Sequence, residues 1–155
     1  MEAMQNGKHE MKGNYGRLLG MTALSFVAMF ILMYAMVDRF ANVYGNLNQL
    51  YMAGLMAAPM VLIEMALMRS MYPNTRLNMV IVAATVAVML LCWVFIRQQT
   101  AISDRQFLRS MIPHHAGAVL MCEQNRLKDP ELINLCQGIV SSQNAEIALM
   151  SSKLR

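Results

Sequence analysis

Two histidines, two methionines and a cysteine lie close together in residues 104–122. At about 100° per residue, a helix would gather most of these side chains into one stripe. Imidazole binds most late transition metals, whereas thioether is a soft donor that favours copper(I), so the mixture points to copper. In the alternative interpretation the methionines and the cysteine are core residues and the histidines lie at a wet edge. The stripe contains Met111, His115, Ala118 and Cys122, with His114 and Met121 along its edge.

Two helices joined by a short loop are expected to carry these residues. Ser103 and Gln106 fit a capping box that starts the first helix at Asp104. Pro113 predicts either a kink or a new helix start just before the histidines. Asp129 and the proline after it fit the N-cap and first position of the second helix. The sequence therefore predicts an antiparallel helical hairpin.

The second helix of the hairpin carries two kinds of positions. One set is expected to form the core: Leu132, Leu135, Ile139 and Leu149. A second stripe contains side chains that could bind a ligand, and it is expected to face the first helix. Its residues are Cys136, Gln143, Ile147 and Met150, with Glu146 at its edge. Cys122 and Cys136 lie on different helices, so either a disulfide or two reduced cysteines buried in the hairpin fit the spacing.

The composition is that of a membrane protein. Apolar residues make up 57% of the 155 residues and charged residues 14%, against a usual quarter. The apolar residues cluster in three runs, 18–37, 50–68 and 79–96, each long enough for a helix to cross a bilayer. We therefore expect an all-α protein with three parts: a polar tail (1–17), a three-span region (18–96) and the hairpin domain (97–155).

The second span has unusual residues. Met52, Met56 and Met60 recur every fourth residue, and Glu64 continues the row. An ionisable group inside a span suggests a functional site, and a methionine ladder could pass copper(I) along. The favoured interpretation is that these methionines pack between helices, because methionine fills irregular gaps.

Positive charges predict the orientation of the spans. With the N-terminus inside, the inner segments hold five Lys and Arg residues, and the first outer loop holds only Arg39. The hairpin is then on the outer side. The first run is expected to remain as an uncleaved span, because no small-residue cleavage site follows it.

Several functional classes are not indicated. The net charge of +4 comes mostly from residues at the span ends, so we expect no nucleic-acid partner. No glycine-rich phosphate loop, H-E-x-x-H pair or G-x-S-x-G elbow occurs in the chain. We therefore expect neither enzyme activity nor an organic cofactor.

A longer motif resembles a known family. The run D-x-x-F-x-x-x-M-I-P-H-H-x-x-A-x-x-M from Asp104 to Met121, followed by Q-x-x-E-I-x-x-M from Gln143 to Met150, closely resembles the bacterial domain of unknown function 305 family. The resemblance implies a ferritin-like helical fold and a place among proteins that include periplasmic copper-binding members. The ligands it implies are His114, His115, Met121 and Met150, with Met111, Asp104 and Glu146 as weaker candidates.

The expected function is a membrane-anchored copper-binding protein on the periplasmic face of a bacterial inner membrane, for copper tolerance or handling. The alternative is a structural or interaction protein whose hairpin packs on a partner and binds no metal. A di-iron redox enzyme ranks last, because the repeated E-x-x-H motifs of such bundles are missing. Beyond the lipid bilayer, the expected partner is a second copy of the chain, joined through the hairpin.

Overall fold

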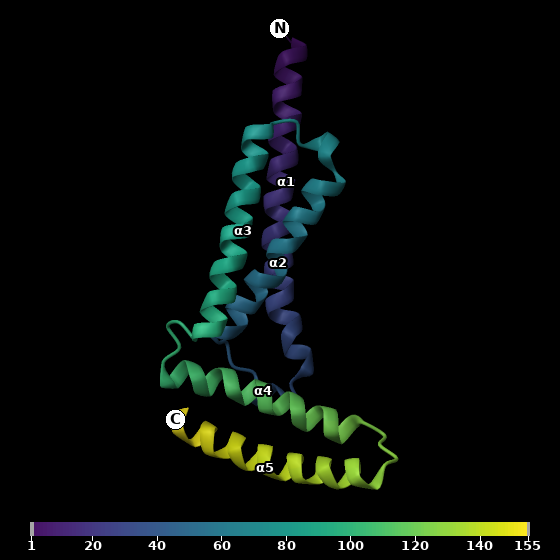
Figure 1. Cartoon of the computed structure of the whole chain (residues 1–155), viewed down its shortest axis with the longest axis vertical. Coiled ribbons are helices and arrows are strands. Elements are labelled where there is room, and N and C mark those ends of the chain that lie inside the picture. The colour runs from purple at the N-terminus through teal and green to yellow at the C-terminus, as the bar shows by residue number, and fades with distance from the viewer. Residues whose placement is uncertain (1, 155) are drawn as a thin grey trace. The chain divides into compact units, whose positions relative to one another are not determined.

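The computed structural model describes residues 2–154, and their side chains from residue 13 onward. It is all-α, as predicted, and residues 2–154 contain no strand (Figure 1). Three short 3-10 turns lie between the helices. The elements are α1 (Glu2–Leu32), η1 (Met33–Met36), η2 (Phe40–Asn42), α2 (Leu47–Leu67), η3 (Arg69–Met71), α3 (Thr75–Gln98), α4 (Asp104–Gln124) and α5 (Pro130–Leu154).

Three helices are long and apolar enough to cross a membrane: Gly13–Met36, Leu47–Leu67 and Thr75–Gln98. They confirm the three predicted spans, with bounds shifted by a few residues. Helix α1 begins at Glu2, so the residues predicted as a polar tail are helical and continuous with the first span. Its His9 and the other side chains before residue 13 lie outside the described residues.

The chain divides into two compact units, and the first contains the spans (1–31 and 50–100). Its buried core, at one end of the helices, consists of Leu18, Val61, Met65 and Tyr72. Gly54 of α2 allows α3 to approach closely, since a Cβ there would meet the sulfur of Cys92 at 2.9 Å.

The methionine row of α2 lies at the edge of the buried face of its helix. The buried residues of α2 are Ala53, Ala57, Ala58, Val61 and Met65. Met52, Met56 and Met60 are instead each more than a third exposed. These three methionines therefore contribute less to the packing of this unit than the alanines beside them, which allow a closer approach of helices.

Glu64 has a partner in the turn that follows its helix. The Tyr72 hydroxyl donates a hydrogen bond of 2.8 Å to Glu64 Oε1. The Tyr72 ring lies 5.2 Å from that of Tyr15, whose hydroxyl donates to Asn78. The carboxylate within the second span is therefore tied to a polar network at one end of this unit.

The second unit (32–49 and 101–155) contains the hairpin. Helices α4 and α5 run antiparallel side by side (Figure 1). A disulfide joins Cys122 to Cys136 next to the connecting loop, with the two Cα atoms 5.3 Å apart. Of the two states that the spacing allowed, the structure has the disulfide. The core between the helices consists of Ile112, Ala116, Val119, Ile147 and Met150.

The predicted helix starts are confirmed, but one capping interaction is not. Asp129 caps α5 by accepting a hydrogen bond of 2.9 Å from the backbone of Glu131. Ser103 precedes α4 without a capping hydrogen bond from its side chain. The amide oxygen of Gln106 instead accepts from the backbone N–H of Leu47, so a tertiary contact replaces the capping box. Pro113 lies inside one continuous helix.

The loop before α2 belongs to the hairpin unit and packs on α4. Asn46 donates a hydrogen bond to the backbone oxygen of Arg109, and Asn48 donates to the hydroxyl of Ser110. Val37 and Tyr44 pack against the hairpin core. One face of α4 therefore covers α5, and a second face covers residues 33–48.

Candidate metal-binding site

His115 lies at the contact between the two helices of the hairpin. It is buried, with 8% of its surface exposed. Its Nδ1 lies 3.1 Å from Oε2 of Glu146 on α5. This contact is close enough for an ion pair with a protonated ring, but Nδ1 has no hydrogen-bond partner of suitable geometry. A buried imidazole nitrogen without such a bond is unusual, and imidazole nitrogen is a common metal ligand.

Met111 precedes His115 by one helical turn on the same side of α4. It is partly buried and packs against the hairpin core. Met111, His115 and Glu146 therefore bring a thioether, an imidazole and a carboxylate to one stretch of the α4–α5 contact. We call these three residues the seam site. Two of them were only weaker candidates in the sequence.

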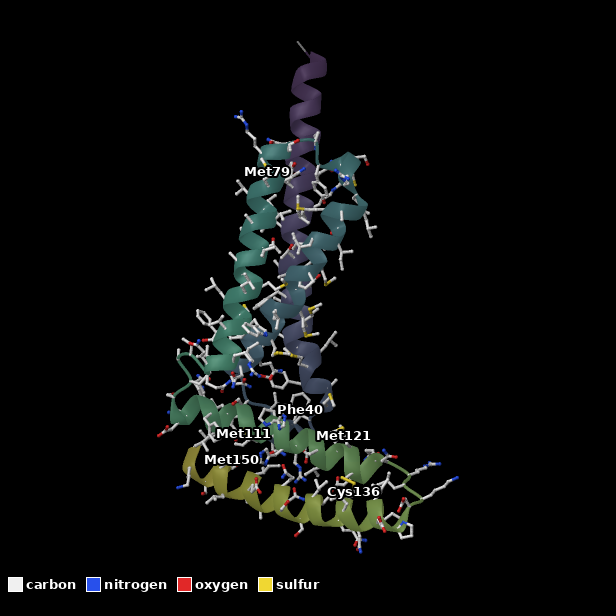
Figure 2. All side chains as sticks on the ribbon, in the orientation of Figure 1. Phe40, Met79, Met111, Met121, Cys136 and Met150 are labelled. Atoms are coloured by element: carbon white, nitrogen blue, oxygen red, sulfur yellow. A yellow bond between two sulfur atoms is a disulfide. The ribbon has the colours of Figure 1, made fainter. Side chains whose placement is uncertain are left out.

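Met150 belongs to the core rather than to an open site. It is 8% exposed and lies among Ile112, Ala116 and Ile147. Met150 is close to Met111 at the end of the hairpin away from the connecting loop (Figure 2). Burial against apolar side chains gives its sulfur a packing role in this structure.

His114 and Met121 lie on a different side of α4. Both are exposed, and 55% of the surface of Met121 is accessible. The rings of His114 and His115 have centroids 6.2 Å apart, and they point to different surroundings. Asp104 is exposed at the first position of α4, roughly 15 Å from His114 along the helix.

The implied ligands therefore do not converge on one point. The disulfide fixes the register of the hairpin, so Met121 lies opposite about residue 137 of α5. Met150 is thirteen residues further along, which is roughly 20 Å at the rise of an α-helix, and Figure 2 shows the two methionines well apart. The antiparallel register therefore separates Met150 from Met121 within one copy of the hairpin.

A sulfur donor that the sequence analysis missed lies in the loop before α2. Met36 packs on Gly117 of α4, where an added Cβ would lie 3.3 Å from the Met36 backbone oxygen and 4.0 Å from its Cβ. Met36 is about eighty residues from Gly117 in the chain, and no local spacing links them. The only signal in the sequence was glycine inside a helix, which often marks close backbone approach.

Within residues 13–154, no three His, Cys, Asp or Glu side chains gather into a group that could hold a metal.

Most of the chain is similar to known protein sequences. The family model described as "Domain of unknown function (DUF305)" matches residues 56–154. "Uncharacterized protein L153" of Acanthamoeba polyphaga mimivirus is 35% identical over 91% of this chain and 93% of its own length. No solved structure matches the chain.

Proposed function

The chain belongs to the DUF305 family, and from this premise we propose that it is a membrane-anchored copper-binding protein that serves copper tolerance or handling. The observation that carries the proposal is the buried Nδ1 of His115, which lies 3.1 Å from Glu146 and has no hydrogen-bond partner. The three apolar helices supply the membrane anchor.

The seam site has the donor set for copper(I). His115 would supply nitrogen and Met111 thioether sulfur, while Glu146 would supply a carboxylate oxygen or hold the imidazole in place. Bound copper would supply a soft cation that the site stores or passes on. Thioether does not protonate, so the sulfur donor remains available in acid, whereas imidazole binds metal only in its neutral form.

We place the hairpin on the periplasmic face of a bacterial inner membrane. The positive charges favour an inner N-terminus, and three spans then put the hairpin outside. The Cys122–Cys136 disulfide supports this side, because disulfides persist in oxidising compartments. Alkaline phosphatase fused after Arg155 should be active. An inactive fusion beside an active cytoplasmic reporter would contradict this location.

The copper proposal is tested with the full chain in detergent. Copper(I) is titrated anaerobically against a chromophoric chelator, for the wild type and for His115→Gln and Met111→Leu. Loss of a direct ligand should weaken copper(I) binding by more than about tenfold, the smallest effect usual for supporting residues around a metal. Met111→Leu keeps apolar volume nearly constant, so the fold should persist.

A control variant makes the methionine substitution elsewhere. Met79→Leu should leave the copper(I) affinity unchanged, since Met79 is an exposed methionine of α3. Circular dichroism of every variant checks that the helices remain. If His115→Gln and Met111→Leu compete for copper(I) as well as the wild type, the seam site is only helix packing and the proposal fails.

An interaction role is the second candidate function, and one observation favours it. Leu132, Leu135 and Leu149, expected to form the hairpin core, are exposed on α5. That expectation was wrong, because α5 turns its other stripe, with Cys136, Ile147 and Met150, toward α4. Exposed leucines at both ends of one helix are a feature of surfaces that bind other helices.

A further inference from the structure

We propose that the Cys122–Cys136 disulfide is a redox site that exchanges electrons with a dithiol of another protein, which enters through the pocket beside it. Both cysteines line this pocket of about 430 Å³, next to the loop that joins α4 to α5 (Figure 2). Each cysteine is partly exposed. Exposed disulfides are more easily reduced than enclosed ones, and they include the regulatory and catalytic ones.

The other walls of the pocket suit a segment of a folded partner. Some are apolar and can bury a side chain, and some are polar and can hydrogen-bond to a peptide backbone. The apolar residues are Leu127, Ile133 and Val140, and the polar ones include Asn125, Gln137 and Ser141. The pocket lies within the hairpin unit, so α4, α5 and their loop are enough to form it.

The hairpin core holds the two helices together without either cysteine. Its residues are Ile112, Ala116, Val119, Ile147 and Met150. Val119 lies about one turn before Cys122 on α4, and Ile147 lies about three turns after Cys136 on α5. We therefore expect the helices to remain paired when the disulfide opens. The two thiols then stay neighbours, so the bond can form again.

Neighbouring thiols in the reduced hairpin favour a dithiol over a monothiol as the partner. A monothiol that bonds to one cysteine is displaced by the other, because the helices hold that second thiol at a high effective concentration. A partner with two neighbouring thiols has its own second thiol at a similarly high concentration. It can therefore complete the reaction before the hairpin reverses it.

The exchange needs no reactant other than this partner. A partner thiolate attacks one sulfur of the hairpin disulfide, and the other sulfur leaves as a thiolate, which gives a mixed disulfide. The second thiolate of the partner then attacks the partner's sulfur in that bond and displaces the hairpin cysteine. Two electrons pass to Cys122 and Cys136, which take up the two protons that the partner's thiols lost. The partner keeps a disulfide, and an oxidised partner reverses the same steps.

Reduced thioredoxin is the protein dithiol for the test, and glutathione is the monothiol. Each is added to the full chain in detergent at the same thiol concentration, and thiols at Cys122 and Cys136 are alkylated at intervals and counted by mass spectrometry. Thioredoxin should reduce both cysteines together, whereas glutathione should leave most of the disulfide intact. Equal reduction by glutathione would overturn the proposal, and so would a disulfide that excess thioredoxin leaves oxidised.

Two tryptophan variants test whether the partner enters through the pocket. Ser141→Trp places a large side chain on an exposed wall of the pocket, so it should slow reduction by thioredoxin several-fold. Ser152→Trp adds the same side chain at an exposed position of α5 outside the pocket lining, so its reduction should match the wild type. Circular dichroism checks that both variants keep their helices. Reduction of Ser141→Trp at the wild-type rate would overturn entry through the pocket.

Discussion

Tyr72 is the single residue whose acid–base behaviour the structure alters most clearly. Its side chain is 3% exposed and donates a hydrogen bond to Glu64. Burial, this hydrogen bond and the negative charge of Glu64 raise the pKa of Tyr72 from 10.0 to about 12. The folded pKa lies above the unfolded value, so neutral Tyr72 contributes stability that is complete below pH 10. This contribution is lost as the pH rises from about 10 to about 12.

A tyrosinate absorbance titration checks this pKa. The wild type should show a late component near pH 12 that Tyr72→Phe removes. Glu64→Gln retains an acceptor but removes the charge, so it should move the late component to lower pH. The network would be refuted if Tyr72→Phe removed a component near pH 10 instead, because an ordinary pKa means that Tyr72 is exposed to water.

The sequence predicted some residues of the candidate site, but it did not predict which of them lie close together. The helical spacing correctly put His115 and Cys122 on the side of α4 that faces α5. It could not show that Met121 points away from this contact, because one helix gives no information about what covers each side. Met36 was missed for a related reason: its position on Gly117 depends on a tertiary contact.

Among the helices of the hairpin, Gly117 and Gly138 provide a matched comparison. A Cβ at Gly138 of α5 would meet nothing within 4 Å, whereas one at Gly117 of α4 would press on the Met36 carbonyl. Alanine in a helix interior is favoured over glycine by up to about 1 kcal/mol. Gly138→Ala should therefore raise the free energy of unfolding by about that amount, while Gly117→Ala should gain less or lose stability.

Denaturant unfolding of the two glycine variants beside the wild type measures this difference. Each variant adds one methyl group to a helix, so their intrinsic helix preferences are matched. Equal stabilisation by both substitutions would mean that the loop does not lie against Gly117 in solution.

The disulfide is the strongest constraint on the hairpin. Cys122 and Cys136 close a loop of 14 residues, and a cross-link of this size contributes about 3 kcal/mol of stability. The double variant Cys122→Ala, Cys136→Ala should lose about this much free energy of unfolding. Reductant should lower the melting temperature of the wild type and leave the double variant unchanged.

Counting thiols checks the pairing directly. In detergent without reductant, alkylation should label only Cys92 of the three cysteines, and all three after reduction. Three labelled cysteines in protein taken directly from membranes would contradict the disulfide. They would also remove one support for an oxidising compartment.

Helix positions were easier to predict than the faces the helices bury. The three spans follow from length and apolar composition, and the start of α5 follows from Asp129 and Pro130. Which stripe of α5 is buried could not be predicted, because both stripes contain apolar residues. The disulfide and Ile147 turn one stripe toward α4 and leave Leu132 and Leu135 outside.

At the scale of the whole molecule, the number of candidate spans between the loop before α2 and α4 is consistent with the contacts between that loop and α4. Two spans separate the loop before α2 from α4, so this loop and the hairpin must emerge on the same side of the membrane. The hydrogen bonds from Asn46 and Asn48 to α4 also require the loop and the hairpin to lie on the same side. The side on which both lie is the one that we propose to be periplasmic.

The exposed leucines of α5 lead to the prediction that two copies associate through the hairpin. Leu132, Leu135 and Leu149 are each about half exposed, so covering one contributes about half of the 1.5–3 kcal/mol of a fully buried leucine, and the three together favour pairing. Two hairpins joined along α5 would form a four-helix bundle with two-fold symmetry. Crosslinking in native membranes should give a dimer that Leu135→Lys abolishes. Gln137→Lys adds the same charge on the opposite flank of α5 and should leave the dimer intact. Crosslinking that gives only monomer at every protein concentration would rule out the pairing.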